Sequence, residues 1–310
     1  MRKLSVRRAG ICCLAALWLG LAGAAWFLPE KEISDAERRK LTKFPTFSLS
    51  SVASGSFMDK FEDYTMDQFP LRDAFRTAKS LFHTCVLQQK DNHDIYIAQG
   101  YAAKLEYPLN TTSVTYAIEK INQIYNTYLT GSGSDIFLSV VPDKGYYLAE
   151  ENGYPSMDYE AMFTLVREGM PWAEYVDITD CLTIQDYYRT DTHWRQEKLI
   201  PVAQKLCGAM GAAIPDTAGF YATAVERPFY GVYYGQAALP MKSETMYLME
   251  NPVLDGCIVT NHELGTTSRV YDMDKLNSRD LYDVYLSGAA LLQAVMQWSL
   301  TEGQYKHLNL

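Results

Sequence analysis

One short segment of this 310-residue chain combines residue types that can transfer a proton. It runs from Tyr187 to Trp194 and places Asp191 two residues before His193. A carboxylate can accept a hydrogen bond from one ring nitrogen of a histidine, which fixes the tautomer and leaves the other nitrogen free to take a proton from a nucleophile. The pair is therefore a candidate catalytic dyad, with His193 as general base and Asp191 as the group that orients it. A purely structural histidine is the alternative interpretation.

Three further residues are candidate substrate-binding groups. Arg189 could pair with an anionic substrate, although a solvated surface arginine is the default for this residue type. Trp194 is expected to anchor the segment in apolar surroundings, with stacking on a sugar ring as a second interpretation. Lys144 follows a continuous apolar run, so we expect it near a sheet edge, where it could meet an acyl or carboxylate group. A structural role for Lys144 is expected equally.

Several other short motifs accompany the Asp191–Trp194 segment. They are Ser54–Phe57, Phe61–Tyr64, Asp67–Asp73, Val141–Lys144, Phe229–Gly231 and Tyr282–Gly288. In this order and spacing, from about Glu32 to Gly288, they resemble the DHHW family of bacterial cell-envelope proteins. That family is similar to the periplasmic alginate O-acetyltransferases, which have an SGNH-hydrolase-like fold. The resemblance implies an O-acyltransferase or esterase acting on cell-surface polysaccharide, with a membrane protein of the MBOAT type delivering the acyl group.

The chain departs from this family after Gly288. The family's serine nucleophile lies beyond the Tyr-Leu-Ser-Gly segment in an Asp-Ser-Tyr-type motif, and residues 289–310 contain no such motif. We therefore expect a chain truncated or frame-shifted before its nucleophile, without esterase or acyltransferase activity. If turnover were found, Ser287 would be the first candidate nucleophile, ahead of Ser299. The alternative function is a non-catalytic glycan-binding envelope protein or a defective remnant.

The elements that must position these residues alternate between strands and helices. Strands are expected at 95–97, 136–141 and 175–178, and helices at 57–69, 72–88, 113–129 and 159–167. The helix at 72–88 is expected to bury Phe75, Ala78, Phe82, Cys85 and Val86. Asp191 and His193 fall in a loop, and short strands, including 229–234, form a β-rich insertion at about 218–260. The pattern predicts an α/β fold, an SGNH-hydrolase-like layered sheet with helices on both faces.

The N-terminus has a membrane-targeting pattern. Four basic residues among the first eight precede an uncharged run at 9–28, long enough to span a bilayer with its basic flank in the cytoplasm. We expect a single-pass anchor at 1–28, a spacer at 29–50, an extracytoplasmic SGNH-like α/β domain at 51–288 and an atypical tail at 289–310. A signal peptide cleaved after Ala24 is the alternative.

Composition narrows the possible partners and cofactors. The chain is 48% hydrophobic and 21% charged, as in ordinary globular proteins. Beyond Arg8, 24 basic and 37 acidic residues give a net charge of −13, which disfavours nucleic acid and anionic lipid as partners. No cofactor or metal is expected, because the glycine-rich run at 131–135 precedes a predicted strand and the cysteines and histidines lack metal-site spacing. Three disulfide pairings remain open among four cysteines that we expect to be buried free thiols: Cys85, Cys181, Cys207 and Cys257.

Overall fold

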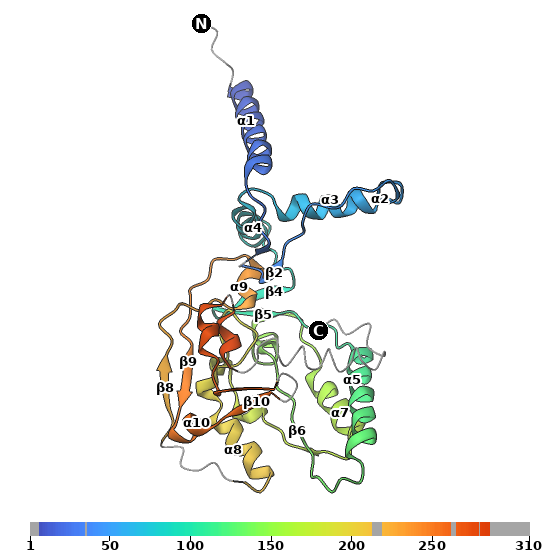
Figure 1. The fold of residues 1–310 in the computed structure, drawn as a ribbon, viewed down its shortest axis with the longest axis vertical. Helices are drawn as coiled ribbons and strands as arrows, with labels where there is room; N and C mark the ends of the chain where they lie inside the picture. The colour runs from blue at the N-terminus through green and yellow to red at the C-terminus, as the bar shows by residue number, and fades with distance from the viewer. Residues whose placement is uncertain (1–5, 35, 213–218, 262–264, 279, 286–310) are drawn as a thin grey trace. The chain divides into compact units, whose positions relative to one another are not determined.

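The computed structural model describes residues 6–34, 36–212, 219–261, 265–278 and 280–285. Contacts within the chain divide it into two compact units (Figure 1). The first consists of Met1–Gln89 with Ala238–Pro240, and the second of Lys90–Ala237 with Met241–Leu310. All five candidate site residues belong to the second unit.

The first unit consists of helices and one short antiparallel hairpin. Its elements are α1 (Val6–Phe27), β1 (Ile33–Ser34), β2 (Arg39–Lys40), α2 (Leu49–Ala53), α3 (Ser56–Asp67) and α4 (Arg72–Leu81), which continues as a π-helical turn over Phe82–Val86. Within the described residues, Arg7–Phe27 in α1 is the one stretch long and apolar enough to cross a membrane. This assignment uses only the length and composition of the helix, and a signal sequence can have the same length and composition.

The helix expected at 72–88 is present, but the burial expected for it is wrong. Phe75, Phe82 and Val86 are 46%, 51% and 63% exposed, and Cys85 is exposed as well. A helical spacing of apolar residues defines a face of the helix without specifying what covers that face. The other three cysteines beyond the anchor are only half-buried, so the expectation of buried thiols is also wrong, although all four are free.

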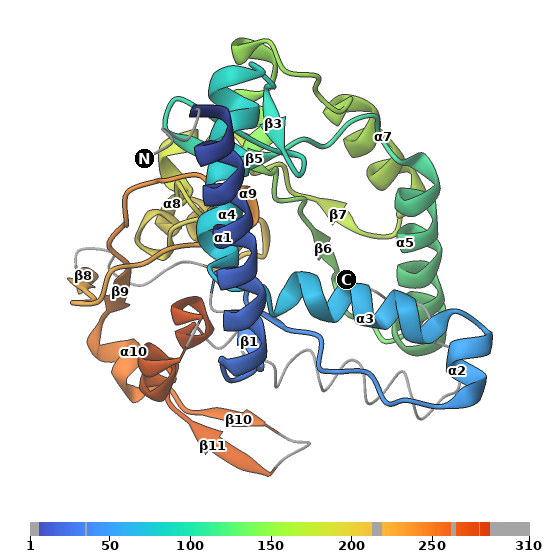
Figure 2. The same ribbon diagram turned by 90° about the horizontal axis from the view of Figure 1, so that it is seen from above.

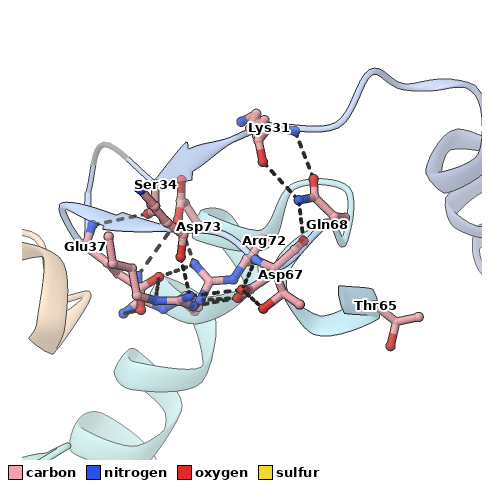
Figure 3. Close-up of polar contacts among 12 residues, drawn as sticks. Lys31, Ser34, Glu37, Thr65, Asp67, Gln68, Arg72 and Asp73 are labelled. Atoms are coloured by element: carbon pink, nitrogen blue, oxygen red, sulfur yellow. Dashed lines mark hydrogen bonds and ion pairs between the residues drawn. The ribbon is translucent and has the colours of Figure 1, made fainter. Parts of the chain in front are cut away.

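A charged cluster joins the β1–β2 hairpin to the corner between α3 and α4 (Figure 3). The buried Asp67 carboxylate accepts hydrogen bonds from the Arg39 guanidinium at 2.9 and 2.5 Å, and from the backbone N–H and hydroxyl of Thr42 at 2.8 and 3.0 Å. Arg72 pairs with Glu37 at 2.6 Å. The hydrogen bonds from Arg39 hold the pKa of Asp67 well below its ordinary value. Asp67 and Arg72 therefore fix the two helices at their junction.

The second unit mixes helices with small sheets. Its helices are α5 (Thr111–Ile124), α6 (Lys144–Leu148), α7 (Tyr159–Gly169), α8 (Ile200–Ala209), α9 (Val232–Ala237) and α10 (Pro252–Gly256). Its antiparallel strands are β3 (Asp91–Asn92), β4 (Ile95–Ala98) and β5 (Tyr101–Lys104) in one sheet, β8 (Tyr221–Ala224) with β9 (Tyr247–Glu250), and β10 (Val259–Asn261) with β11 (Thr266–Ser268). The strands β6 (Phe137–Leu138) and β7 (Glu174–Tyr175) pair in parallel.

The mixed helix and strand content agrees with the α/β expectation. The helices α5 and α7 lie side by side in both ribbon views, next to the β6–β7 pair in Figure 2. Among the described residues the largest sheet has three strands and β6–β7 is the only parallel pair, so the layered arrangement stays a prediction.

One predicted strand is a helix. Residues 229–234 were expected to be extended; Phe229 does form an isolated antiparallel bridge with Glu244, but α9 begins at Val232. The backbone N–H groups of its first turn meet acceptors from the Thr190–Asp191 loop: Val232 donates to the Asp191 carboxylate, and Tyr233 and Tyr234 donate to the Thr190 carbonyl. These partners satisfy N–H groups that a helix start leaves unpaired, so a tertiary contact outweighs the strand preference of an aromatic run.

Two hydrophobic clusters hold the segment that carries Asp191. Tyr187 packs into one cluster, with Val176, Ile178, Leu182 and Val202. Its neighbour Tyr188 packs into the other, with Phe229, Met246, Leu248, Leu281 and Val284. Successive residues of an extended segment point to opposite sides, so the two tyrosines anchor the chain in both clusters immediately before the site.

Candidate functional site

Asp191 and His193 are hydrogen-bonded to each other, as their spacing predicted. The His193 Nδ1 to Asp191 Oδ1 distance is 2.5 Å, and the His193 backbone N–H donates to the same oxygen at 3.1 Å. The Asp191 side chain is 1% exposed, whereas that of His193 is 45% exposed. With Nδ1 engaged by the carboxylate, Nε2 is the ring nitrogen available for proton transfer.

The environment keeps Asp191 ionised. Burial alone raises the pKa of Asp191, but hydrogen bonds from the His193 ring and from the backbone N–H groups of Val232 and His193 outweigh it, and the pKa lies below its ordinary value. The carboxylate is therefore an acceptor at neutral pH, the form that orients a histidine and stabilises its protonated state.

The loop itself is a narrow hairpin-like turn. Tyr187 and Trp194 form an isolated antiparallel bridge, and the Tyr188 N–H donates to the His193 carbonyl at 3.1 Å. Thr190 lies fully buried inside the turn, where its hydroxyl accepts from the Gly231 N–H at 2.9 Å. The turn thus places the Asp191 carboxylate inward and the His193 ring outward.

Gly231 allows the start of α9 to approach the dyad closely. A Cβ atom at this position would lie 2.2 Å from the Asp191 Cβ and 2.3 Å from its Cα. No side chain fits in that space, so the contact of Val232 with Asp191 depends on glycine at 231.

Glu244 supports the same turn from the β-rich segment. Its carboxylate accepts the backbone N–H groups of Arg189 and Thr190 at 2.7 and 2.8 Å, and the Thr190 hydroxyl at 2.9 Å. Reciprocal backbone hydrogen bonds of 2.9 Å with Phe229 fix Glu244 in turn. Arg189 and Thr190 are therefore positioned by residues far along the chain.

Lys144 lies on the other side of this backbone. It is 2% exposed, and its ammonium group donates to the carbonyls of Tyr188 and Arg189 at 3.0 and 3.4 Å, with the Tyr233 ring centroid 5.0 Å away. Burial lowers the pKa of Lys144 to about 7, although the nearby carboxylates of Asp191 and Glu244 act in the opposite direction. Lys144 thus supports the turn from within, and a contact with substrate stays a prediction.

The other two predicted substrate-binding residues have different surroundings. Arg189 is exposed, with its guanidinium carbon 5.7 Å from the centroid of the Tyr101 ring. Trp194 is half-buried and packs against the cluster that contains Tyr187. Trp194 therefore anchors the turn, and Arg189 is the exposed cation nearest in sequence to the dyad.

The solved structures that match part of this chain include the following three. One is a DHHW family protein from Eubacterium siraeum, with 17% identity over 52% of this chain and 55% of that chain, at a TM-score of 0.43. The O-acetyltransferase domain of Pseudomonas putida AlgJ matches at 17% identity, 51% and 66% coverage and a TM-score of 0.38. Bacillus cereus PatB1 with a sulfonyl adduct matches at 14% identity, 58% and 64% coverage and a TM-score of 0.40.

These likenesses concern the fold alone, and the matched parts span about half to two thirds of those chains. No family model and no curated protein matches the sequence. The geometry of the chain's own residues is therefore what supports His193 as a base.

Three residues of the site were not predicted as site residues. Glu244, Gly231 and Tyr282, whose ring stacks on His193, follow the dyad by some 40 to 90 positions in the chain. Gly231 and Tyr282 lie within motifs that carry the family resemblance, which was the only available signal. The candidate nucleophiles Ser287 and Ser299 lie outside the described residues.

Proposed function

We propose that the second unit is an SGNH-like O-acyltransferase or esterase site in which His193 is the general base. One observation carries this proposal: a buried, ionised Asp191 holds Nδ1 of a half-exposed imidazole. Nε2 would take the proton of a hydroxyl group, whose oxygen then attacks the acyl carbonyl carbon. The imidazolium would return that proton to the leaving oxygen when the tetrahedral intermediate collapses.

The proposed substrate is a cell-surface polysaccharide, acylated by a donor that an MBOAT-type membrane partner supplies. Both parts of this proposal are what the resemblance of the sequence motifs to the DHHW family implies. A sugar hydroxyl suits the chemistry of the dyad, because its proton must be removed before the oxygen can attack. The acidic body, with a net charge of −13 beyond Arg8, argues for a partner other than nucleic acid.

The proposed location is a membrane anchored through α1, with the second unit outside the cytoplasm. Its support is the basic N-terminal flank followed by the apolar stretch Arg7–Phe27. Fractionation of expressing cells tests it: the protein is expected in the membrane and accessible to external protease. A soluble secreted product beginning near Ala25 would exclude the anchor but would still agree with export from the cytoplasm.

The base is tested by hydrolysis of p-nitrophenyl acetate by the full chain in detergent. The assay uses high protein concentration, so that slow hydrolysis by water that His193 activates can also be detected. The sequence alone led us to expect no activity, but the hydrogen-bonded dyad leads us to expect a slow rate that disappears in His193→Ala and in Asp191→Asn. His83→Ala, which removes an imidazole from the first unit, is the matched control and should keep the rate.

Equal rates in the wild type and in His193→Ala would contradict the proposal. The alternative function, glycan binding without catalysis, would then be tested by measuring the binding of acetylated polysaccharide to the wild type and to His193→Ala. A rate that also disappears in Ser287→Ala would identify that serine as the nucleophile.

A further inference from the structure

The ring of Tyr282 lies flat against the His193 imidazole. The two ring centroids are 3.8 Å apart and the planes are inclined by 15°. Tyr282 belongs to the 3₁₀ turn Leu281–Val284, almost ninety residues after the dyad. The stacked pair therefore results from the fold and from no local sequence pattern.

Tyr282 is itself held in place. Its ring meets the Tyr285 ring edge-on at 4.9 Å and the Tyr188 ring at 6.3 Å. Its backbone N–H donates to the Asp280 carboxylate at 3.0 Å. A ring fixed in this way can restrain a second ring that stacks on it.

His193 needs such restraint because Asp191 fixes only one edge of a half-exposed imidazole. A flat contact opposes tilting of the ring about the hydrogen bond to Asp191, and so keeps the direction of Nε2 constant. The face of an aromatic ring is also electronegative, so it attracts a cationic ring more strongly than a neutral one.

We propose that Tyr282 is a positioning residue of the dyad, whose ring face restrains the His193 imidazole and favours its protonated form. This inference rests on the proposed role of His193 as a base, and assigns to Tyr282 part of the stabilisation of the imidazolium that forms during proton transfer. The ionisable groups around His193 are the Asp191 carboxylate on the same turn and the Tyr282 phenol, with the Tyr233 hydroxyl reaching Thr192 from α9 at 3.3 Å. The Lys144 ammonium in α6 interacts with the Asp191 carboxylate.

The test is an NMR pH titration of His193 in the full chain, labelled at histidine and solubilised in detergent, with His193→Gln to assign the signal. Tyr282→Leu removes the aromatic face, and the pKa of His193 is expected to fall by about half a pH unit. Tyr282→Phe keeps the face and should leave the titration unchanged. Tyr271→Leu, which removes another ring of the same hydrophobic cluster, should also leave it unchanged.

An unchanged titration in a folded Tyr282→Leu protein would overturn the inference, as would an equal fall in Tyr282→Phe, which would assign the effect to the hydroxyl. If Tyr282→Leu does not fold, Tyr282→Trp decides, because its larger face should keep the pKa of His193 at or above the wild-type value. A lower value in that variant would overturn the inference. The titration reports on the ring alone, so an absence of esterase activity would count against the proposed function and not against the stacking effect.

Discussion

Two buried aspartates, Asp67 in the first unit and Asp191 in the second, share most of their physical properties. Each is less than 10% exposed, each accepts several hydrogen bonds, and each has a pKa below its ordinary value. They differ in the group that donates to them. Asp67 is held by the Arg39 guanidinium and by Thr42, in a cluster that continues to other charged groups (Figure 3), whereas Asp191 is held by an imidazole.

The partner decides what each carboxylate can do. A guanidinium stays protonated at any physiological pH, so the Asp67 cluster can stabilise the corner between α3 and α4 but cannot move a proton. An imidazole changes its charge near neutral pH and has a second nitrogen. A buried carboxylate with a lowered pKa therefore marks a candidate catalytic site only where its partner can titrate.

The largest difference between the two aspartates should appear in activity. Asp191→Asn removes the charge that orients and stabilises the His193 imidazolium, so we expect the His193-dependent hydrolysis of p-nitrophenyl acetate to fall at least about 100-fold. Asp67→Asn should leave that rate within about twofold. Parallel assays with matched protein concentrations test this contrast, and equal losses in both variants would remove the distinction between the two sites.

The next effect concerns how closely the chain packs on Asp191. Gly231→Ala would place a methyl group against the Asp191 backbone, and we expect the free energy of unfolding to fall by about 3 kcal/mol or more. Gly208→Ala is the matched control, because a Cβ there meets nothing within 4 Å and the residue lies in α8. Urea unfolding should show the control unchanged or slightly stabilised. Equal stability of the two variants would show that the turn can move away from α9.

For Asp67 the expected loss is in stability. Asp67→Asn removes the carboxylate that accepts both hydrogen bonds from the Arg39 guanidinium, although Arg39 keeps its ion pair with Glu37, and this loss should cost about 2 kcal/mol at neutral pH. The folded pKa of Asp67 lies below its unfolded value near 3.8, so the unfolded chain binds more protons on acidification and the carboxylate's contribution is lost as pH falls below about 4. The gap in the free energy of unfolding between wild type and Asp67→Asn, measured by urea unfolding, should therefore be smaller below pH 4 than at pH 7. A constant gap would mean that its cause is not the carboxylate charge.

Whether a structural feature could be predicted from the sequence depends on how far apart the residues that form it lie in the chain. The hydrogen bond between Asp191 and His193 was predicted, because a carboxylate two residues from an imidazole can reach it within one turn. The helices at 113–129 and 159–167 were predicted from local spacing and are present as α5, extended by a π-helical turn, and α7.

Contacts between distant segments could not be predicted. Glu244 and Tyr282 reach the dyad by tertiary packing, which leaves no fixed spacing in the sequence. Lys144 was expected at a sheet edge, but it lies buried behind the turn, since its ammonium group satisfies backbone carbonyls there. The second half of the strand expected at 229–234 belongs to the helix α9 for the same reason, because the Thr190–Asp191 loop supplies the acceptors for its first turn.

The buried Lys144 should give the second unit a pH dependence of stability at neutral and alkaline pH, where that of Asp67 in the first unit is already complete. The pKa of Lys144 is lowered by burial to about 7, below its ordinary value of 10.5, so the unfolded chain binds more protons between those values. Stability should therefore rise with pH above about 7, by about 1–2 kcal/mol between pH 7 and pH 9, and this rise should be absent in Lys144→Met. Urea unfolding of both proteins over that range tests it. A parallel rise in Lys144→Met would assign the effect to another group.

The smallest effect should come from the partner of Asp67. Arg39 donates to both carboxylate oxygens, and a lysine in its place could present only one point charge, so Arg39→Lys should lower the free energy of unfolding. The Arg39 side chain is 43% exposed, so solvent screens the pair and we expect a loss of at most about 1 kcal/mol. A double-mutant cycle of Arg39→Lys with Asp67→Asn isolates the coupling, which should weaken in high salt. A coupling near zero would mean that the contacts of Asp67 with Thr42 and Arg72 hold the carboxylate without help from Arg39.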